Sequence, residues 1–223
     1  MKKILLSCSV LAIVAFAACK KNSPAPSYTA QVMFVNGCAG TVNINVTVQN
    51  AAIAGATNLG FLKNSGYQGI PGGSDNLSFI LSSTGTPLIS TTSSFTANLN
   101  YSVFLGGLVN NCAPLILSDD MTPPASGSAK VRLVNLSHDT LSLTGNAGSV
   151  AFATGITSGT ASSFATITAG TYIIKAGDPS NIGSVVSAPS QAYASGKIYT
   201  LIYTGTSTGT LSSILTLTVI PNN

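Results

Sequence analysis

The sequence predicts an all-β protein made of two tandem antiparallel β-sandwich modules. Three observations lead to this prediction. Apolar and polar residues alternate with a period of two, glycine and other turn residues interrupt the chain at short intervals, and one stretch of sequence recurs after about 99 residues. Period-two alternation buries one face of a strand and leaves the other in water, as in an antiparallel sheet. Frequent turn signals between short strands are typical of sandwiches and barrels.

The alternation is clearest in two segments, 42–48 and 210–219. In the first, valine and isoleucine alternate with asparagine and threonine, and in the second, leucine and valine alternate mainly with serine and threonine. No stretch shows a convincing periodicity of 3.6 residues, which would indicate an amphipathic helix. We therefore expect about seven strands in each module, arranged as in an immunoglobulin-like sandwich.

The recurring stretch indicates an internal repeat. Residues 30–36 (AQVMFVN) resemble residues 129–135 (AKVRLVN) at an offset of 99, and Tyr101 and Tyr199 lie in similar apolar segments at an offset of 98. Two anchors near the start and end of each unit thus keep nearly the same spacing. The unit of about 95 residues is a normal size for one β-sandwich.

Composition places the boundaries of the predicted parts. Residues 118–127 contain a Pro-Pro pair among small polar residues, which is typical of a linker. Residues 20–27 contain two prolines and polar neighbours, which favour an extended tether. The predicted parts are a signal peptide (1–18), a tether (19–28), a first module (29–117), a linker (118–127) and a second module (128–223).

The N-terminus predicts export and lipidation. Lys2 and Lys3 precede an uncharged apolar run of about 15 residues, shorter than the roughly 20 that span a bilayer. The run ends Phe-Ala-Ala-Cys19, which resembles the lipobox of bacterial lipoproteins, in which the cysteine is acylated and becomes the first mature residue. Phe16 stands where the lipobox usually has leucine, so ordinary cleavage after Ala17, leaving Cys19 a free thiol, is the alternative.

The expected partner is therefore a membrane, reached through the lipid on Cys19, because several acyl chains together give a stable anchor. Lys20 follows the cysteine in place of the aspartate that retains lipoproteins in the inner membrane of enteric bacteria. This favours the outer membrane. The stretch Lys20-Lys21-Asn22 lacks the acidic residues common in surface-export signals, so exposure on the cell surface stays open.

Charge and composition exclude several functions. Charged residues make up 6% of the chain, far below the usual quarter, and no basic cluster is available to neutralise the phosphates of a nucleic acid. His138 is the only histidine, so a histidine-based zinc site cannot form. The chain has no glutamate, and its five aspartates are scattered through turns and the linker, which makes a glycosidase pair improbable. We expect no cofactor, no metal and no catalytic residue.

The second unit carries the motifs of a known family. It opens Val-Arg-Leu-Val-Asn-Leu-Ser-His-Asp (131–139), continues with Ala-Gly-Thr-Tyr (169–172), and closes with Ala-Ser-Gly-Lys-Ile-Tyr-Thr (194–200). These pieces resemble the bacterial "domain of unknown function 4397" family over about residues 29–221, most clearly in the second unit. The resemblance implies exported β-sandwich modules, often lipoproteins of Bacteroidota-like bacteria. It implies no established activity and offers no catalytic residue.

The cysteines left after export are candidates for a disulfide. Cys8 belongs to the signal peptide and Cys19 is the lipid site, so Cys38 and Cys112 remain, both in an oxidising compartment. A standard immunoglobulin topology places their two turns at opposite ends of the sandwich. Either the topology differs or the two thiols stay apart.

Several polar motifs have structural explanations at this stage. Asp139 is expected to stabilise a turn by accepting hydrogen bonds from nearby backbone N–H groups. Asp119 and Asp120 fall in the linker as solvated residues, with a weak calcium site as the alternative. Ser207 matches G-x-S-x-G, but strands on both sides predict a hairpin turn instead of a nucleophile elbow. Thr140, in Asp-Thr-Leu, resembles an O-glycosylation sequon of Bacteroidota.

The predicted function is a non-enzymatic envelope lipoprotein that spaces, binds or adheres, with envelope proteins or glycans as candidate partners. The main alternative is an accessory carbohydrate-binding lipoprotein, and a hydrolase is third. Most of the seven tyrosines and eight phenylalanines fall inside strands, where packing in a core is the default. A tyrosine-lined ligand groove is the minority alternative for these rings. Oligomeric state stays open.

Overall fold

The computed structural model describes residues 29–41, 43–208 and 214–223. The predicted signal peptide, Cys19 and tether lie outside the described residues, as do residue 42 and the first four residues (210–213) of the strand expected over 210–219. Apart from two short 3₁₀ turns, strands are the only regular secondary structure in the described residues, which confirms the all-β prediction. No helix in the described ranges is long and apolar enough to cross a membrane.

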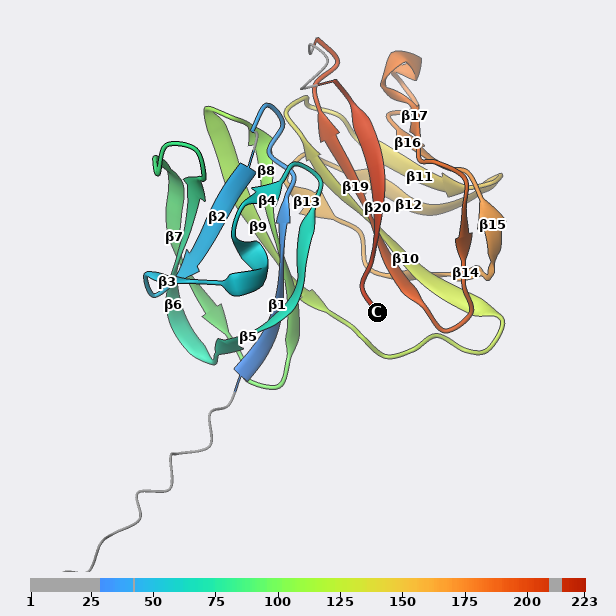
Figure 1. The fold of residues 1–223 in the computed structure, drawn as a ribbon. Helices are drawn as coiled ribbons and strands as arrows, with labels where there is room; N and C mark the ends of the chain where they lie inside the picture. The colour runs from blue at the N-terminus through green and yellow to red at the C-terminus, as the bar shows by residue number, and fades with distance from the viewer. Residues whose placement is uncertain (1–28, 42, 209–213) are drawn as a thin grey trace, which may run out of the picture.

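We call residues 29–119 the first half of the chain and residues 128–223 the second half (Figure 1). The strands of the first half are β1 (Thr29–Asn36), β2 (Asn43–Val48), β3 (Ala51–Ala52), β4 (Leu59–Gly60), β5 (Asn64–Pro71), β6 (Gly73–Leu81), β7 (Pro87–Phe95), β8 (Asn100–Leu108) and β9 (Asn111–Asp119).

The strands of the second half are β10 (Ser128–Ser137), β11 (Leu143–Ala147), β12 (Val150–Ile156), β13 (Thr160–Ala161), β14 (Ala165–Thr168), β15 (Gly170–Tyr172), β16 (Ile174–Gly177), β17 (Val186–Ser187), β18 (Gln191–Tyr193), β19 (Ile198–Gly205) and β20 (Thr216–Pro221). The 3₁₀ turns η1 (Ala54–Ala56) and η2 (Ile182–Ser184) lie in the first and second half, respectively. Both halves therefore contain more strands than the seven expected, and several of these are only two residues long.

Each half has two main sheets that enclose an apolar cluster. In the first half the sheets have the orders β5-β1-β8-β9 and β3-β2-β6-β7. In the second half the corresponding orders are β13-β10-β19-β20, with β14 also paired to β10, and β12-β11-β16-β17. The strands β15 and β18 form a small additional sheet. Fully buried side chains such as Phe34 and Phe79 fill the first cluster, and Leu133 and Leu201 lie in the second.

The pairing departs from the antiparallel expectation at one place in each half. β1 runs parallel to β8, and β10 runs parallel to β19, whereas the other named strand pairs are antiparallel. The register is the same in both parallel pairs. Val32 lies opposite Tyr101 in the first, and Val131 lies opposite Tyr199 in the second. The repeat seen in the sequence therefore reappears as matched strand pairing.

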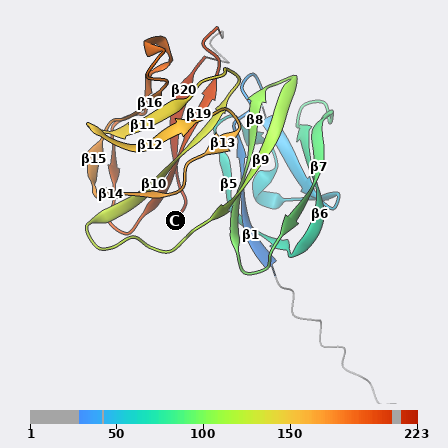
Figure 2. The ribbon, with the colours of Figure 1, turned by 180° about the vertical axis from the view of Figure 1, so that it is seen from behind.

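A third apolar cluster joins the two halves. Met33 and Val35 on β1 and Phe104 on β8 contact Val134 on β10 and Ile202 on β19. Alternate residues of β1 face the core of their own half, so the strand is buried on both faces. This agrees with the burial of β1 and β10, in which nearly every residue of the C-terminal part of each strand is buried. Figure 2 shows the two halves side by side from behind.

Four strands at the edges of sheets contain a proline. These strands are β5, β7, β9 and β20, with Pro71, Pro87, Pro114 and Pro221. Proline has no backbone N–H to donate, so it interrupts the row of unpaired groups that an edge strand offers to another chain. The molecule thus limits strand addition along these edges.

A candidate binding groove between the two halves

A buried ion pair crosses the contact between the halves. Arg132 Nη1 on β10 lies 2.7 Å from Asp119 Oδ1 at the end of β9, and the side chains are 3% and 0% exposed. Ser102 on β8 donates to Asp119 Oδ2 at 2.6 Å and accepts a hydrogen bond from Arg132 Nη2 at 2.9 Å. Burying both charges is unfavourable unless each finds several partners, and here each does.

The hydrogen bonds continue on both sides of the ion pair. Arg132 Nε donates to Thr200 Oγ1, which donates to Asn222 Oδ1 at 2.8 Å. Asn222 Nδ2 then donates to the hydroxyl of Tyr67, and this hydroxyl donates to Asp119. Burial, and secondly the charge of Asp119, raises the pKa of Tyr67 above its ordinary value. Tyr67 therefore remains a neutral donor, and the network fixes the two halves relative to each other.

This network corrects the prediction for the linker. Residues 118–127 were expected to be a solvated loop, but Ser118 and Asp119 are the last residues of β9, and Asp119 is buried. Asp120 does fit the expectation, because it is exposed and lies 2.7 Å from Lys130 Nζ. Its hydrogen bond from Lys130 lowers the pKa of its carboxyl group. The two neighbouring aspartates thus have different roles, one internal and one at the surface.

Cys38 and Cys112 are bonded in the structure, with their Cα atoms 5.8 Å apart. The geometric difficulty raised by an immunoglobulin topology disappears because β1 and β8 are parallel neighbours. Their ends therefore lie together, and Ala39 bridges Leu108 just beyond them. Cys38 follows β1 and Cys112 is the second residue of β9, so the disulfide ties the end of β1 to the β8–β9 hairpin.

At the matching end of the second half, a carboxylate makes the connection. Asp139 Oδ1 accepts a hydrogen bond from Thr206 Oγ1 at 2.6 Å, and Oδ2 accepts one from the backbone N–H of Ser207 at 2.6 Å. These partners follow β19, 67 and 68 residues further along the chain, so the expectation of a local turn is wrong. Although burial works in the opposite direction, the bonds from Thr206 and Ser207 lower the pKa of Asp139.

Ser207 lies in a turn, as the sequence predicts. Gly209, the last residue of its G-x-S-x-G motif, is outside the described residues. In the described part of the chain no three His, Cys, Asp or Glu side chains group as metal ligands would.

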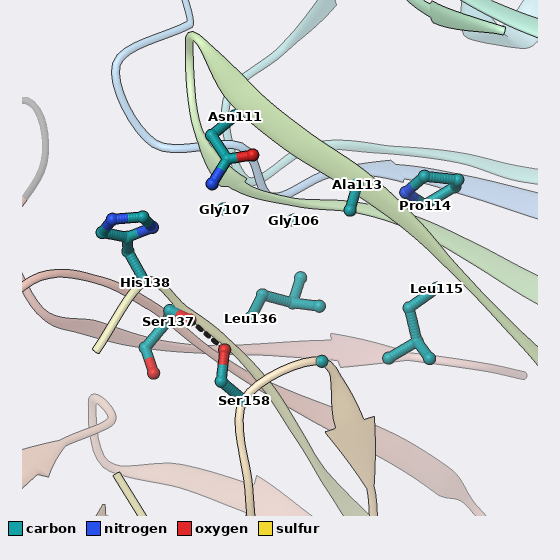
Figure 3. A pocket seen from close by; sticks show the side chains of 11 residues that line it. Gly106, Gly107, Asn111, Ala113, Pro114, Leu115, Leu136, Ser137, His138 and Ser158 are labelled. Carbon is teal, nitrogen blue, oxygen red and sulfur yellow. Dashed lines mark hydrogen bonds between the residues drawn. The ribbon is translucent and has the colours of Figure 1, made fainter. Parts of the chain in front are cut away.

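A cavity of about 410 Å³, which we call the junction groove, is lined by residues next to Cys112 and by His138, the neighbour of Asp139 (Figure 3). One wall comes from the β8–β9 hairpin and the other from the end of β10 and the loop after β12. The lining residues are Gly106, Gly107, Asn111, Ala113, Pro114, Leu115, Leu136, Ser137, His138, Ser158 and Gly159.

His138 is exposed and also lines two adjoining cavities of about 330 and 550 Å³, so the concave surface continues on both sides of it.

Small residues let the walls approach each other. A Cβ atom on Gly106 would lie 2.9 Å from the side chain of Leu136, and a Cβ on Gly37 would lie 2.5 Å from the same leucine. Gly107 has a φ of 94°, a conformation that other residues rarely adopt. Within the wall formed by the second half, Ser158 donates to the carbonyl of Ser137. The contact between the halves therefore forms the groove, which is already present without a ligand.

Thr140 is exposed in the loop after β10 and lines the cavity of about 550 Å³ beside His138. Its O-glycosylation stays a prediction, as does the lipidation of Cys19, which lies outside the described residues.

The fold and the groove define an all-β protein with sandwiched sheets in each half of the chain and a cavity where the halves meet. Residues 30–144 match the family model "Domain of unknown function (DUF4397)", and the chain belongs to this family. The match starts in β1 and ends in β11, so it crosses the contact between the halves. No curated protein matches the chain.

Among solved structures, the chain is similar to a carbohydrate-binding module of family 26 from Eubacterium rectale Amy13K, in complex with maltoheptaose. The identity is 10%, and the similarity covers 86% of this chain and 96% of the other, with a TM-score of 0.27. So low a TM-score supports no conclusion about the ligand of this chain.

Proposed function

We propose that the protein is an exported, lipid-anchored, non-enzymatic binding module of the bacterial cell envelope, and that its two halves are copies of one module. The observation that carries the proposal is the position of the junction groove. β1 begins at Thr29, where the predicted tether joins, and ends beside Cys38 and the β8–β9 hairpin. Eight strand residues span about 26 Å. The groove would therefore lie toward the end of the first half opposite Thr29, where the anchor is expected.

A preformed groove suits binding better than a flexible one. The disulfide and the Asp139 contact stabilise the segments next to its walls, and the buried ion pair holds together the two halves that supply them. A site that needs no ordering on binding avoids part of the entropic cost of association. The volume of about 410 Å³ also falls within the range of pockets that take small ligands or short segments of a polymer.

Anchoring is tested at the N-terminus. Mass spectrometry of the mature protein is expected to find acylated Cys19 as the first residue. The variant Cys19→Ala is expected to move from the membrane fraction to the soluble fraction of the envelope. An unmodified mature N-terminus at Ala18 would show ordinary signal cleavage and would contradict the lipoprotein proposal.

Binding at the groove is tested by cross-linking in intact cells. A photoreactive amino acid replaces Asn111, on the groove wall, or Thr92, on the exposed face of β7 as a matched control. We expect a covalent adduct with an envelope component only from position 111, and we expect Ser158→Trp, which fills the groove, to reduce it. Equal adducts at both positions, or none at position 111, would contradict a binding role for the groove.

The alternative of an accessory carbohydrate-binding protein needs exposed aromatic rings. The residues that line the junction groove include none. The alternative therefore depends on another part of the surface.

A further inference from the structure

A second concavity of about 510 Å³ lies in the second half. The strands that border it, β12, β14 and β15, lie on the side away from the first half (Figures 1 and 2). It runs between the β11–β12 hairpin on one side and β14 and the end of β15 on the other. We call it the side groove. Its lining residues are Ala147, Gly148, Ser149, Val150, Ala151, Phe152, Ala165, Thr166, Ile167, Thr168 and Tyr172.

The side groove combines two aromatic rings with several hydroxyl groups and no charged side chain. Phe152 and Tyr172 are partly buried and pack against the core of the second half. Ser149, Thr166 and Thr168 are exposed and carry the hydroxyls. Such a surface favours a neutral ligand that has both apolar faces and hydroxyl groups, because a charged ligand would find no partner for its charge.

The ring of Tyr172 is held in place from behind. Its centroid lies 6.1 Å from that of Tyr193, which is fully buried and packs edge-to-face on Tyr199 at 4.9 Å. The hydroxyl of Tyr199 in turn accepts a hydrogen bond from the backbone N–H of Ala194 at 2.9 Å. A ring supported in this way loses little freedom when a ligand stacks on it.

The internal repeat shows that this ring is not required by the fold. Ile70 in the first half and Ile167 in the second are equivalent, because they pair with the equivalent residues Ala30 and Ala129. Five residues after this isoleucine, the first half has Asp75 and the second half has Tyr172.

The aromatic pair in each core is kept, with centroid distances of 5.3 Å for Phe95 and Tyr101 and 4.9 Å for Tyr193 and Tyr199. Asp75 instead accepts a hydrogen bond from Gln49. The partly exposed ring is thus a feature of one half.

The backbone beside the rings can add hydrogen bonds. Among the described strands, β12 pairs only with β11, and β14 pairs only with β10. Each strand therefore has one side without a strand partner, where N–H and C=O groups can bind a ligand or water. Val150, 66% exposed at the rim, leaves the groove open to solvent.

We propose that the side groove binds a neutral saccharide. One face of a sugar ring stacks on Tyr172, because the face of an aromatic ring carries partial negative charge and attracts the C–H groups of the sugar. The hydroxyls of Thr166 and Thr168 bind the sugar hydroxyls. This inference goes beyond the proposed function, because it depends neither on the junction groove nor on the lipid anchor.

Calorimetric titration of the full mature chain in detergent tests the proposal. The probes are neutral oligosaccharides of glucose, mannose, galactose, xylose and N-acetylglucosamine, each four to seven units long. We expect at least one series to bind. Tyr172→Ala is expected to weaken this binding about tenfold, whereas Tyr172→Phe, which keeps the ring, is expected to change it by no more than about threefold.

Further variants separate binding from folding. Urea unfolding establishes whether Tyr172→Ala still folds, because its ring contacts the core. Val150→Lys and Thr168→Ala change exposed positions, so they are expected to weaken binding without loss of stability. Leu99→Ala is the matched control, since Leu99 is a similarly exposed apolar residue, 47% exposed, in the loop before β8. It is expected to leave binding unchanged.

Three outcomes would overturn the proposal: no probe binds, binding survives both Tyr172→Ala and Val150→Lys, or an uncharged extended peptide binds the groove while no saccharide does. Because these measurements use purified protein, a failure of cross-linking at Asn111 would leave the saccharide result standing. Loss of saccharide binding would likewise leave the junction groove proposal untouched.

Discussion

The two halves share one framework and differ in how it is closed. In both, a buried asparagine at the end of the first strand donates to a distant backbone carbonyl, from Asn36 to Leu59 at 3.1 Å and from Asn135 to Ile156 at 3.0 Å. In both, a tyrosine hydroxyl accepts from a backbone N–H five residues upstream, from Thr96 to Tyr101 and from Ala194 to Tyr199. The latter contact resembles the tyrosine corner of β-sandwiches.

The difference lies at the end that borders the junction groove. In the first half the disulfide joins the end of β1 to the β8–β9 hairpin, and in the second half Asp139 joins the end of β10 to the turn after β19. The same connection is thus covalent in one half and made of hydrogen bonds to a carboxylate in the other. The first depends on an oxidising compartment, and the second depends on an ionised side chain.

The largest effect is expected from removing the buried ion pair that joins the two halves. Asp119→Ala leaves the buried Arg132 without its countercharge, so the free energy of unfolding is expected to fall by about 3–5 kcal/mol. Urea unfolding followed by circular dichroism measures it. The double variant Asp119→Leu with Arg132→Met removes both charges and is the control, expected to recover most of the loss. A loss below about 1 kcal/mol would show that solvent screens the pair.

The second prediction removes the covalent closure. The double variant Cys38→Ala with Cys112→Ala is expected to lower the free energy of unfolding by about 2–4 kcal/mol, because the open chain gains conformational freedom when unfolded. Hydrogen exchange is expected to rise more in β8 than in β19. Wild-type protein in a reductant should behave like the variant. An equal rise in hydrogen exchange in β8 and β19 would contradict the view that the disulfide stabilises mainly the first half.

The third prediction concerns the carboxylate closure. Asp139→Asn is expected to lower the free energy of unfolding at pH 7 by about 1–2 kcal/mol, through weaker hydrogen bonds to Thr206 and Ser207. The pKa of Asp139 is lowered in the folded state, so its stabilisation is present above the unfolded value of about 3.9 and is lost as the pH falls through the folded pKa.

The difference in the free energy of unfolding between wild type and Asp139→Asn, measured with urea, should therefore shrink as the pH is lowered from 5 to the lowest pH at which both proteins still fold. A difference that stays constant with pH would mean that the charge of Asp139 is not involved. Hydrogen bonds from Ser142 and Ser180 also lower the pKa of Asp178. Asp178 is present in both proteins, so its titration cancels in the difference.

The smallest effect tests what the halves share. Tyr101→Phe removes the hydrogen bond from the Thr96 N–H, and Tyr199→Phe removes the one from the Ala194 N–H together with a long one, 3.5 Å, to the Ala192 carbonyl. Each change is expected to cost about 1 kcal/mol. The two losses, measured by urea unfolding under one set of conditions, should agree closely. A clear inequality would show that the matched tyrosines do not stabilise the two halves in the same way.

Much of the fold follows from local sequence. Alternation predicts the strands, and the two anchors of the repeat predict matched halves. The parallel pairing of β1 with β8 was not predicted, because it depends on how the sheets wrap around each core. The double burial of β1 and β10 did leave a signal, since residues 32–35 and 133–134 are apolar runs without alternation.

The ion pair left a signal as well. Arg132 stands between Val131 and Leu133, a place for a charge only if a partner is buried with it. The partner could not be found from the sequence, because Asp119 lies in a stretch with the composition of a linker. The junction groove has no local signal, since its walls come from segments brought together by the contact between the halves.

The prolines at the sheet edges have a consequence for life on a membrane. If the chain is anchored as proposed, many copies diffuse in one plane and meet sideways far more often than they would in solution. Edge strands in which a proline interrupts the row of unpaired N–H groups then matter most, since an uninterrupted edge could pair with a strand of a neighbouring copy at each collision. Neighbouring copies on the membrane would then stay separate, because strand pairing between them is hindered at Pro71, Pro87, Pro114 and Pro221.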